Sequence, residues 1–178
     1  VAAAAGYNVT MIDIQQEYVD KGLATIERSL GKLVSKERMT QEDADATLAR
    51  ISLSTDRSDC ADCDLVVEAV PEIVDLKTSI FAELDSICKP ETILASNTSS
   101  ISISTIADAT NRPDKVIGMH FMNPVPIMKL VEVINGDKTS TETNAAVIEA
   151  SEKMGKIALS CNDSPGFVSN RILCPMLN

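Results

Sequence analysis

The chain has 178 residues, of which 44% are hydrophobic and 24% charged, a composition typical of a folded globular protein. Its 16 basic and 26 acidic residues give a net charge of -10, which argues against binding to nucleic acid or to anionic membranes. The five cysteines are odd in number and scattered, which favours reduced thiols in an intracellular enzyme over a disulfide framework.

Helix and strand patterns alternate along the whole chain. In chain order we expect a helix end at 1–5 closed by Gly6, a strand at 7–13, a helix at 15–35, a helix capped by Thr40, strands at 49–56 and 64–70, a helix at 74–88, a strand at 92–98, a short helix near 102–109, strands at 116–121 and 129–134, a helix at 141–155, a strand at 157–161, and a helix with Ser164 as its cap and Pro165 at its first position. This alternation predicts an α/β fold with a mainly parallel sheet. The economical interpretation is one compact domain, followed by the start of a second element near Pro165.

The single histidine, His120, falls at the carboxyl end of the strand pattern 116–121. In an open α/β sheet, ligands bind outside those strand ends. In the next strand pattern Glu132 lies between apolar residues on a face expected to be buried, where a carboxylate needs a partner. A carboxylate that bonds one ring nitrogen stabilises the imidazolium and leaves the other nitrogen as a general base. The spacing therefore predicts either a catalytic His120–Glu132 pair or a pair that only ties two strands together.

Polar residues also follow two other strand patterns. Residues 95–102 form either a turn that caps the next helix or a shelf of hydroxyl and amide groups facing a ligand, with Asn97 and Ser99 as candidates. Asp13 ends the strand pattern 7–13. In dinucleotide-binding folds an acid at the end of the second strand bonds the ribose hydroxyls and favours NAD over NADP, although Asp is also a common residue at strand ends.

Two further patterns concern charge and cysteine. Ser29, Lys32 and Lys36 line one face of the predicted helix 15–35, as a solvated basic strip or as a dock for a phosphorylated ligand. Cys60 and Cys63 have the spacing of zinc and redox motifs, but no second such pair exists and the cysteines precede a strand. We therefore expect no metal site.

Four segments together resemble the NAD-dependent L-3-hydroxyacyl-CoA dehydrogenase family, which includes 3-hydroxybutyryl-CoA dehydrogenases. They are LVVEAVPE, ILASNTSS, GMHFMNPVPIMKLVEVI and DSPGFVSNRI, in that order along nearly the whole chain. The resemblance implies a Rossmann-type, doubly wound sheet truncated at both ends. It implies an NAD-binding domain over residues 1–164, without the family's first strand and Gly-rich loop, and the start of an all-helical domain over 165–178.

The resemblance also implies a role for each matching residue. The catalytic group would be His120 as general base, Glu132 as its partner, Ser99 on the reacting oxygen and Asn170 as a positioning residue. The cofactor group would be Asp13, Glu72, Lys77, Ser99 and Asn123, to which the polar turn adds Asn97. The substrate group would be Ser29 and Lys36 on coenzyme A, together with Ser99.

The implied activity is the oxidation of L-3-hydroxyacyl-CoA to 3-oxoacyl-CoA by NAD, or the reverse reduction, in fatty-acid metabolism. The longer protein would be a homodimer formed through its C-terminal domain, while the isolated fragment would turn over little. Alternatives are a module of a multifunctional fatty-acid-oxidation enzyme, a related hydroxyacid dehydrogenase that uses a lysine base, or a non-catalytic protein that retains the fold. Acyl-chain length and compartment (cytoplasm, mitochondrion or peroxisome) stay open.

Overall fold

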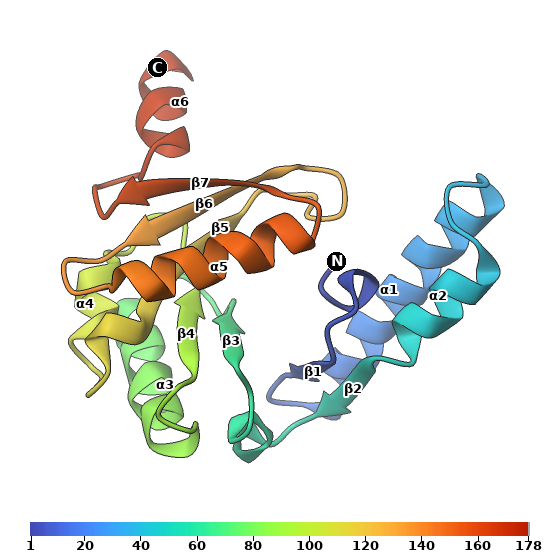
Figure 1. Ribbon diagram of the computed structural model, residues 1–178, viewed down its shortest axis with the longest axis horizontal. Coiled ribbons are helices and arrows are strands. Elements are labelled where there is room, and N and C mark those ends of the chain that lie inside the picture. Colours follow the sequence, from blue (N-terminus) through green and yellow to red (C-terminus); the bar gives the residue numbers. More distant parts are fainter. Residues whose placement is uncertain (178) are drawn as a thin grey trace. The chain divides into compact units, whose positions relative to one another are not determined.

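The computed structural model describes residues 1–177 (Figure 1). Residue 178, the last residue of the segment 165–178 in which a second domain is expected to begin, lies outside the described residues. The chain folds into two compact units, Val1–Asp59 and Cys60–Asn178. Each unit combines helices with parallel strands, which confirms the predicted α/β fold. In the described residues no helix is both long and apolar enough to cross a membrane.

The N-terminal unit is built around a two-stranded parallel sheet. Its elements are the 3-10 helix η1 (Ala3–Ala5), β1 (Val9–Ile12), α1 (Gln16–Ser35), α2 (Gln41–Leu48) and β2 (Ile51–Ser54). Gly6 ends η1 with φ 93°, a left-handed conformation that glycine adopts without steric penalty. The Thr40 hydroxyl accepts a hydrogen bond from the Asp43 amide at the start of α2, as the sequence predicts.

The second unit holds a five-stranded sheet in the order β3-β4-β5-β6-β7. The short helix η2 (Arg57–Cys60) spans the boundary between the two units. The elements of the second unit are β3 (Leu65–Glu68), α3 (Val74–Ile87), β4 (Ile93–Ser96), α4 (Ile103–Ala107), η3 (Pro113–Lys115), β5 (Val116–Phe121), β6 (Leu130–Asn135), α5 (Thr141–Lys153), β7 (Ile157–Asn162) and α6 (Ser169–Leu177). Neighbouring strands are parallel except β5 and β6, which run antiparallel. The observed sheet is therefore mainly parallel, as the sequence predicts.

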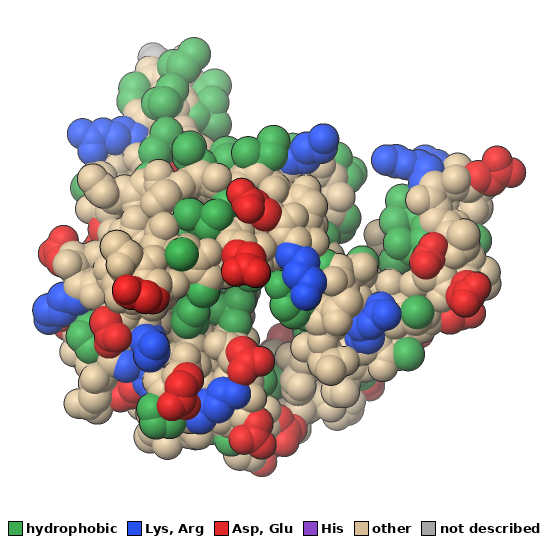
Figure 2. Space-filling view, viewed as in Figure 1, with side chains coloured by type: hydrophobic (Ala, Val, Ile, Leu, Met, Phe, Trp, Pro, Cys, Tyr) green, Lys and Arg blue, Asp and Glu red, His purple; other side chains and the backbone are tan. Residues whose placement is uncertain are grey.

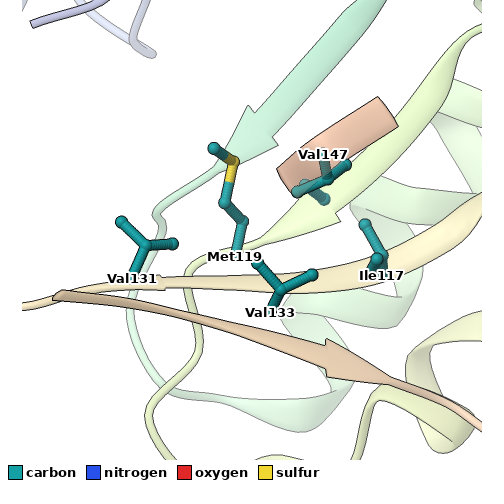
Figure 3. Packing of buried hydrophobic residues seen from close by; sticks show 6 residues of the cluster. Ile117, Met119, Val131, Val133 and Val147 are labelled. Atoms are coloured by element: carbon teal, nitrogen blue, oxygen red, sulfur yellow. The ribbon is translucent and has the colours of Figure 1, made fainter. Parts of the chain in front are cut away.

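One face of this sheet packs against α5 to form a hydrophobic cluster. Figure 3 shows that the strand side chains of this cluster lie next to Val147 from α5. The cluster consists of Ala95, Ile117, Met119, Val131, Val133 and Val147. Successive side chains of a strand point to opposite faces of the sheet. Val131 and Val133 lie in this layer, so Glu132 between them points to the opposite face.

The opposite face of β5 and β6 packs against α4 and carries the polar residues. Gly118 lies there so close to its neighbours that an added Cβ would come within 2.8 Å of Ile134 and 3.0 Å of Ile103. His120 and Glu132 follow on the same face, in register with one another. The sheet thus separates an apolar layer under α5 from a layer in which a histidine and a carboxylate are buried together.

The C-terminal helix begins later than the sequence predicts. Ser164 and Pro165 do not start it, because Gly166 and Phe167 adopt φ of 75° and 52°, values that a right-handed helix excludes. Residues 165–168 form turns instead, and α6 starts at Ser169. Hydrophobic side chains gather over α6 in Figure 2, in agreement with the exposure of Ile172, Leu173, Met176 and Leu177.

Candidate active site

The polar cluster of the second unit is assembled from the ends of three neighbouring strands. β4 leads into the turn that carries Asn97 and Ser99, β5 ends just after His120, and β6 contributes Glu132. His120 and Glu132 face one another across the antiparallel β5–β6 pair, which places their side chains on the same side of the sheet. The sheet thereby positions a titratable pair on two directly paired strands.

Both ring nitrogens of His120 have hydrogen-bond partners. Nδ1 lies 2.8 Å from Oε2 of Glu132, and Nε2 lies 3.1 Å from the hydroxyl oxygen of Ser99. A carboxylate only accepts hydrogen bonds, so Nδ1 carries the proton and Nε2 of the neutral ring is the acceptor. The imidazole therefore presents its basic nitrogen to Ser99. The predicted contact between His120 and Glu132 is present.

Glu132 is fully buried, yet both of its oxygens are satisfied. Oε2 accepts from His120, while Oε1 accepts from the backbone amides of Val168 at 3.1 Å and Ser169 at 2.7 Å. Burial acts to raise the pKa of Glu132, but these hydrogen bonds outweigh it and hold the pKa below its ordinary value. Glu132 is therefore held as a charged hydrogen-bond acceptor that faces Nδ1 of His120.

The segment after β7 completes this cluster. Asn170, near the start of α6, donates a hydrogen bond from its side-chain amide to the backbone oxygen of Ser99 at 3.1 Å. The Asn97 side chain accepts one from the Phe121 amide at 2.8 Å, which ties the turn after β4 to the end of β5. The structure thus brings His120, Glu132, Ser99 and Asn170 together.

Glu72 fixes the turn that carries Ser99. Its Oε1 accepts from the amides of Ser99 and Ser100 at 2.9 and 3.1 Å, and from the Thr98 hydroxyl. Burial acts to raise the pKa of Glu72, but these bonds and the nearby Lys77 ammonium hold it below its ordinary value. Glu72 therefore positions the backbone on which the hydroxyl of Ser99 depends.

Lys77 lies beneath this turn, with a side chain only 1% exposed. Its ammonium contacts Oε1 of Glu68 at 2.7 Å, the Val70 carbonyl at 3.1 Å and Oε2 of Glu72 at 3.4 Å. Glu68 also accepts from the Ser96 hydroxyl at 2.7 Å. A charge with three acceptors around it holds its neighbours in place, so Lys77 links β3 to the turn after β4.

Glu68 was not among the residues predicted from the sequence, although a signal for it exists. It stands among apolar residues in the strand pattern 64–70, just as Glu132 does in its own strand. A carboxylate in such a position needs a partner once it is buried. Lys77, on the helix α3 that follows β3, supplies the cation. The same reasoning that selects Glu132 would have selected Glu68.

The connection between β5 and β6 carries Asn123 on its exposed part. Lys156, which is largely buried, donates hydrogen bonds to the carbonyls of Val125 and of Met128, the latter at 2.8 Å. Burial lowers the pKa of Lys156. The ammonium therefore anchors the connection that bears Asn123, a role that the sequence gives no sign of.

The remaining predicted residues belong to the N-terminal unit. Asp13 follows β1 and is exposed, and its Oδ1 accepts from the Ile14 amide at 2.7 Å. Ser29 is partly buried on α1, and Lys32 and Lys36 are exposed near its end. The basic strip thus lies on α1 as predicted, in a unit separate from the His120 cluster.

No group of three or more His, Cys, Asp and Glu side chains within residues 1–177 has an arrangement that could hold a metal ion. The Cys60 and Cys63 pair precedes β3, as the sequence predicts. Burial raises the pKa of the Cys63 thiol, and neighbouring acidic residues add to the effect. A thiol with a raised pKa is a poor nucleophile and a poor metal ligand at neutral pH.

Comparison with known proteins identifies relatives for the chain. A "Probable 3-hydroxybutyryl-CoA dehydrogenase" of Deinococcus radiodurans is 57% identical over the whole chain, which covers 64% of that protein. The crystal structure of the (S)-3-hydroxybutyryl-CoA dehydrogenase of Ralstonia eutropha matches with a TM-score of 0.97 and 50% identity, over 99% of this chain and 62% of that one. A "Fatty acid oxidation complex subunit alpha" of Psychrobacter arcticus is 43% identical over 98% of this chain and 24% of its own length.

The chain spans 61–64% of the length of four curated relatives whose names all contain 3-hydroxybutyryl-CoA dehydrogenase. The sequence profile described as "3-hydroxyacyl-CoA dehydrogenase, NAD binding domain" matches residues 1–164. These matches confirm the Rossmann-type fold that the motifs imply. The chain therefore belongs to the family of 3-hydroxyacyl-CoA dehydrogenase NAD-binding domains.

Proposed function

We propose that the natural protein containing this chain oxidises L-3-hydroxyacyl-CoA to 3-oxoacyl-CoA with NAD, or catalyses the reverse reduction, in fatty-acid metabolism. The observation that carries this proposal is His120, whose ring nitrogens join a buried carboxylate on one side and a hydroxyl group on the other. Such an imidazole is arranged to take a proton from an alcohol and return it to a ketone. The names of the relatives support the substrate class.

In this mechanism Nε2 of His120 takes the proton of the substrate 3-hydroxyl, while Glu132 stabilises the positive charge that the ring acquires. Ser99 donates a hydrogen bond to the same substrate oxygen, because its hydroxyl lies next to Nε2. As the C3–H bond breaks, its electron pair leaves as hydride and the C–O double bond forms. Asn170 keeps the Ser99 backbone in place.

NAD, when bound, supplies the hydride acceptor. The residues of the chain fit such a cofactor, because Asp13 is exposed at the carboxyl end of β1, where an acid bonds ribose hydroxyls. Ser99 and Asn123 would lie near the nicotinamide, with Asn97 supporting the turn. Glu72 would belong to the cofactor site beside them. Lys77 is buried, so its part in that site would be to hold Glu72 in place.

The acyl-CoA would be held through its phosphates by two residues of the basic strip on α1, Ser29 and Lys36. In a chain with a net charge of -10 a local basic strip is the feature that suits an anionic ligand. We further propose that residues from 165 begin a second, helical domain through which the longer protein forms a homodimer. The end of the profile match at residue 164 and the exposed apolar side chains of α6 support this proposal.

The function is tested with the natural protein by following the loss of NADH absorbance in the presence of acetoacetyl-CoA. We expect turnover in the wild type, and a decrease of about 10²–10⁴-fold in kcat for His120→Gln with nearly unchanged NAD affinity. Ser79→Ala, which removes an exposed hydroxyl on α3, is the control and should retain full activity. Near wild-type turnover in His120→Gln would show that the assigned base is wrong.

A second candidate is the same activity as one module of a multifunctional fatty-acid-oxidation chain. The match to the Psychrobacter arcticus subunit, of which this chain covers 24%, supports this second candidate. The two candidates differ in the mass of the natural polypeptide, which is about four times that of this chain for such a subunit. Mass spectrometry of the purified natural protein distinguishes them. A protein that retains the fold without catalysis would bind NADH but show no turnover.

A further inference from the structure

The turn between β7 and α6 contains an unusual pair of backbone conformations. Gly166 and Phe167 both have positive φ, at 75° and 52°. Glycine adopts this region freely, whereas a side chain such as phenylalanine is strained there. Strained residues persist only where surrounding contacts hold them, and they concentrate at functional sites.

The backbone that follows Phe167 is directed at Glu132. The consecutive amides of Val168 and Ser169 both donate to Oε1 of this carboxylate, at 3.1 and 2.7 Å. Successive amides that converge on one oxygen form an anion-binding concavity, and such concavities arise where the backbone passes through left-handed conformations. The strained turn therefore satisfies the carboxylate oxygen that His120 does not reach.

The side chain of Phe167 is directed at His120. The two ring centroids lie 6.0 Å apart with an interplanar angle of 61°, an edge-on arrangement that aromatic rings prefer. Phe167 is only 2% exposed, and His120 only 6%. The phenyl ring thus helps to exclude water from the imidazole while its backbone holds the carboxylate partner.

We infer that Phe167 is a positioning residue for the His120–Glu132 pair. Its left-handed backbone turns the Val168 and Ser169 amides towards Glu132, and its ring holds the imidazole in the orientation in which Nδ1 faces that carboxylate. The inference rests on the proposed role of His120 as the base. It adds a residue from the turn before α6 to a pair that otherwise comes from two strands.

The test uses NMR of the ¹⁵N-labelled 178-residue chain without ligands. Because the chain has one histidine, its imidazole signals belong to His120 without further assignment. In the wild type we expect the proton on Nδ1, which faces Glu132, to exchange slowly with water. In Phe167→Leu the loss of the aromatic edge should speed this exchange roughly tenfold.

Two further variants separate positioning from general stability. Phe81→Leu makes the same change at a fully buried site on α3, and it should lower the thermal midpoint while leaving the His120 signals as in the wild type. Phe167→Gly removes the ring together with the strain. It should speed His120 exchange as Phe167→Leu does, but leave the amides of Val168 and Ser169 better protected than in Phe167→Leu.

Unchanged imidazole exchange in both Phe167 variants would overturn the inference, as would an equal increase in Phe81→Leu. The readout requires no cofactor, substrate or turnover. A failed dehydrogenase assay of the natural protein would therefore refute the proposed function, while the spectra would still decide whether Phe167 orients the pair.

Discussion

His120 and Glu132 occupy directly opposite positions on the antiparallel strands β5 and β6, and their side chains meet at 2.8 Å on one face of the sheet. The neighbouring residues on the same strands face the apolar layer beneath α5. The pairing of β5 with β6 therefore determines both the apolar layer beneath α5 and the polar layer that holds His120 and Glu132.

The charge of Glu132 should make stability depend on pH. The pKa of Glu132 is lowered in the folded chain, so the stabilisation is fully present above the ordinary value of 4.5 and is lost as the pH falls through the lower folded-state pKa. We expect Glu132→Gln to lower the free energy of unfolding by roughly 1–3 kcal/mol at neutral pH. Urea unfolding over a pH series should show this difference shrinking below pH 4.5. The exposed control Glu91→Gln should leave the free energy nearly unchanged, and a difference that is constant with pH would contradict the assignment.

The buried ion pair under the Ser99 turn should be costly to break. Lys77→Met leaves Glu68 buried without its cation, and we expect a loss of about 3–5 kcal/mol in the free energy of unfolding measured with urea. Lys138→Met removes the exposed partner of Asp108 and should change stability little. Similar losses in both variants would show that burial does not set the strength of the first pair.

Gly118 should tolerate no side chain. In Gly118→Ala the new Cβ would lie 2.8 Å from Ile134 on the adjacent strand, and we expect overpacking to destabilise the chain by about 1–3 kcal/mol. Gly31→Ala is the matched control, because nothing lies within 4 Å of its Cβ and it is inside α1. That change should stabilise by roughly 0.5–1 kcal/mol, since alanine is the better helix former. Thermal unfolding of both variants checks the opposite signs.

The thiol of Cys161 should be unreactive in the folded chain. Burial, together with the carboxylates of Glu132 and Asp163, raises the pKa of Cys161 to about 11. At neutral pH the reactive thiolate is therefore scarce. Mass spectrometry after brief iodoacetamide treatment should find the exposed Cys174 alkylated first and Cys161 unmodified, with Cys161 labelled only after denaturation. Equal labelling of the two in the folded chain would refute the assignment.

The strands and helices could be predicted from the sequence because each carries a local pattern. The alternation in residues 129–134 indicated that Glu132 is buried, and the polar strand ends indicated Asn97 and Ser99. The antiparallel direction of β6 was not inferred, although residues 122–129 are too few for the crossover of about a dozen residues that parallel strands need. Here a usable signal was present in the length of the connection.

Other features depend on contacts that no local pattern contains. The segment Ser164-Pro165-Gly166 predicts a helix that starts at Pro165, whereas the positive φ of Phe167 is held by the surrounding structure. The two carbonyls that Lys156 bonds come from another connection of the chain. Residues of this kind are recognised only once the fold brings distant segments together.

The pairing of β5 with β6 has a consequence for how such a protein can change. Because side chains alternate with a period of two, inserting one amino acid within β6 ahead of Glu132 would turn that carboxylate into the apolar layer and bring a valine opposite His120. Insertions in the exposed connection between the strands need not disturb the alignment. The length of the connection can therefore change more readily than that of β6, where a single added codon would separate Glu132 from His120.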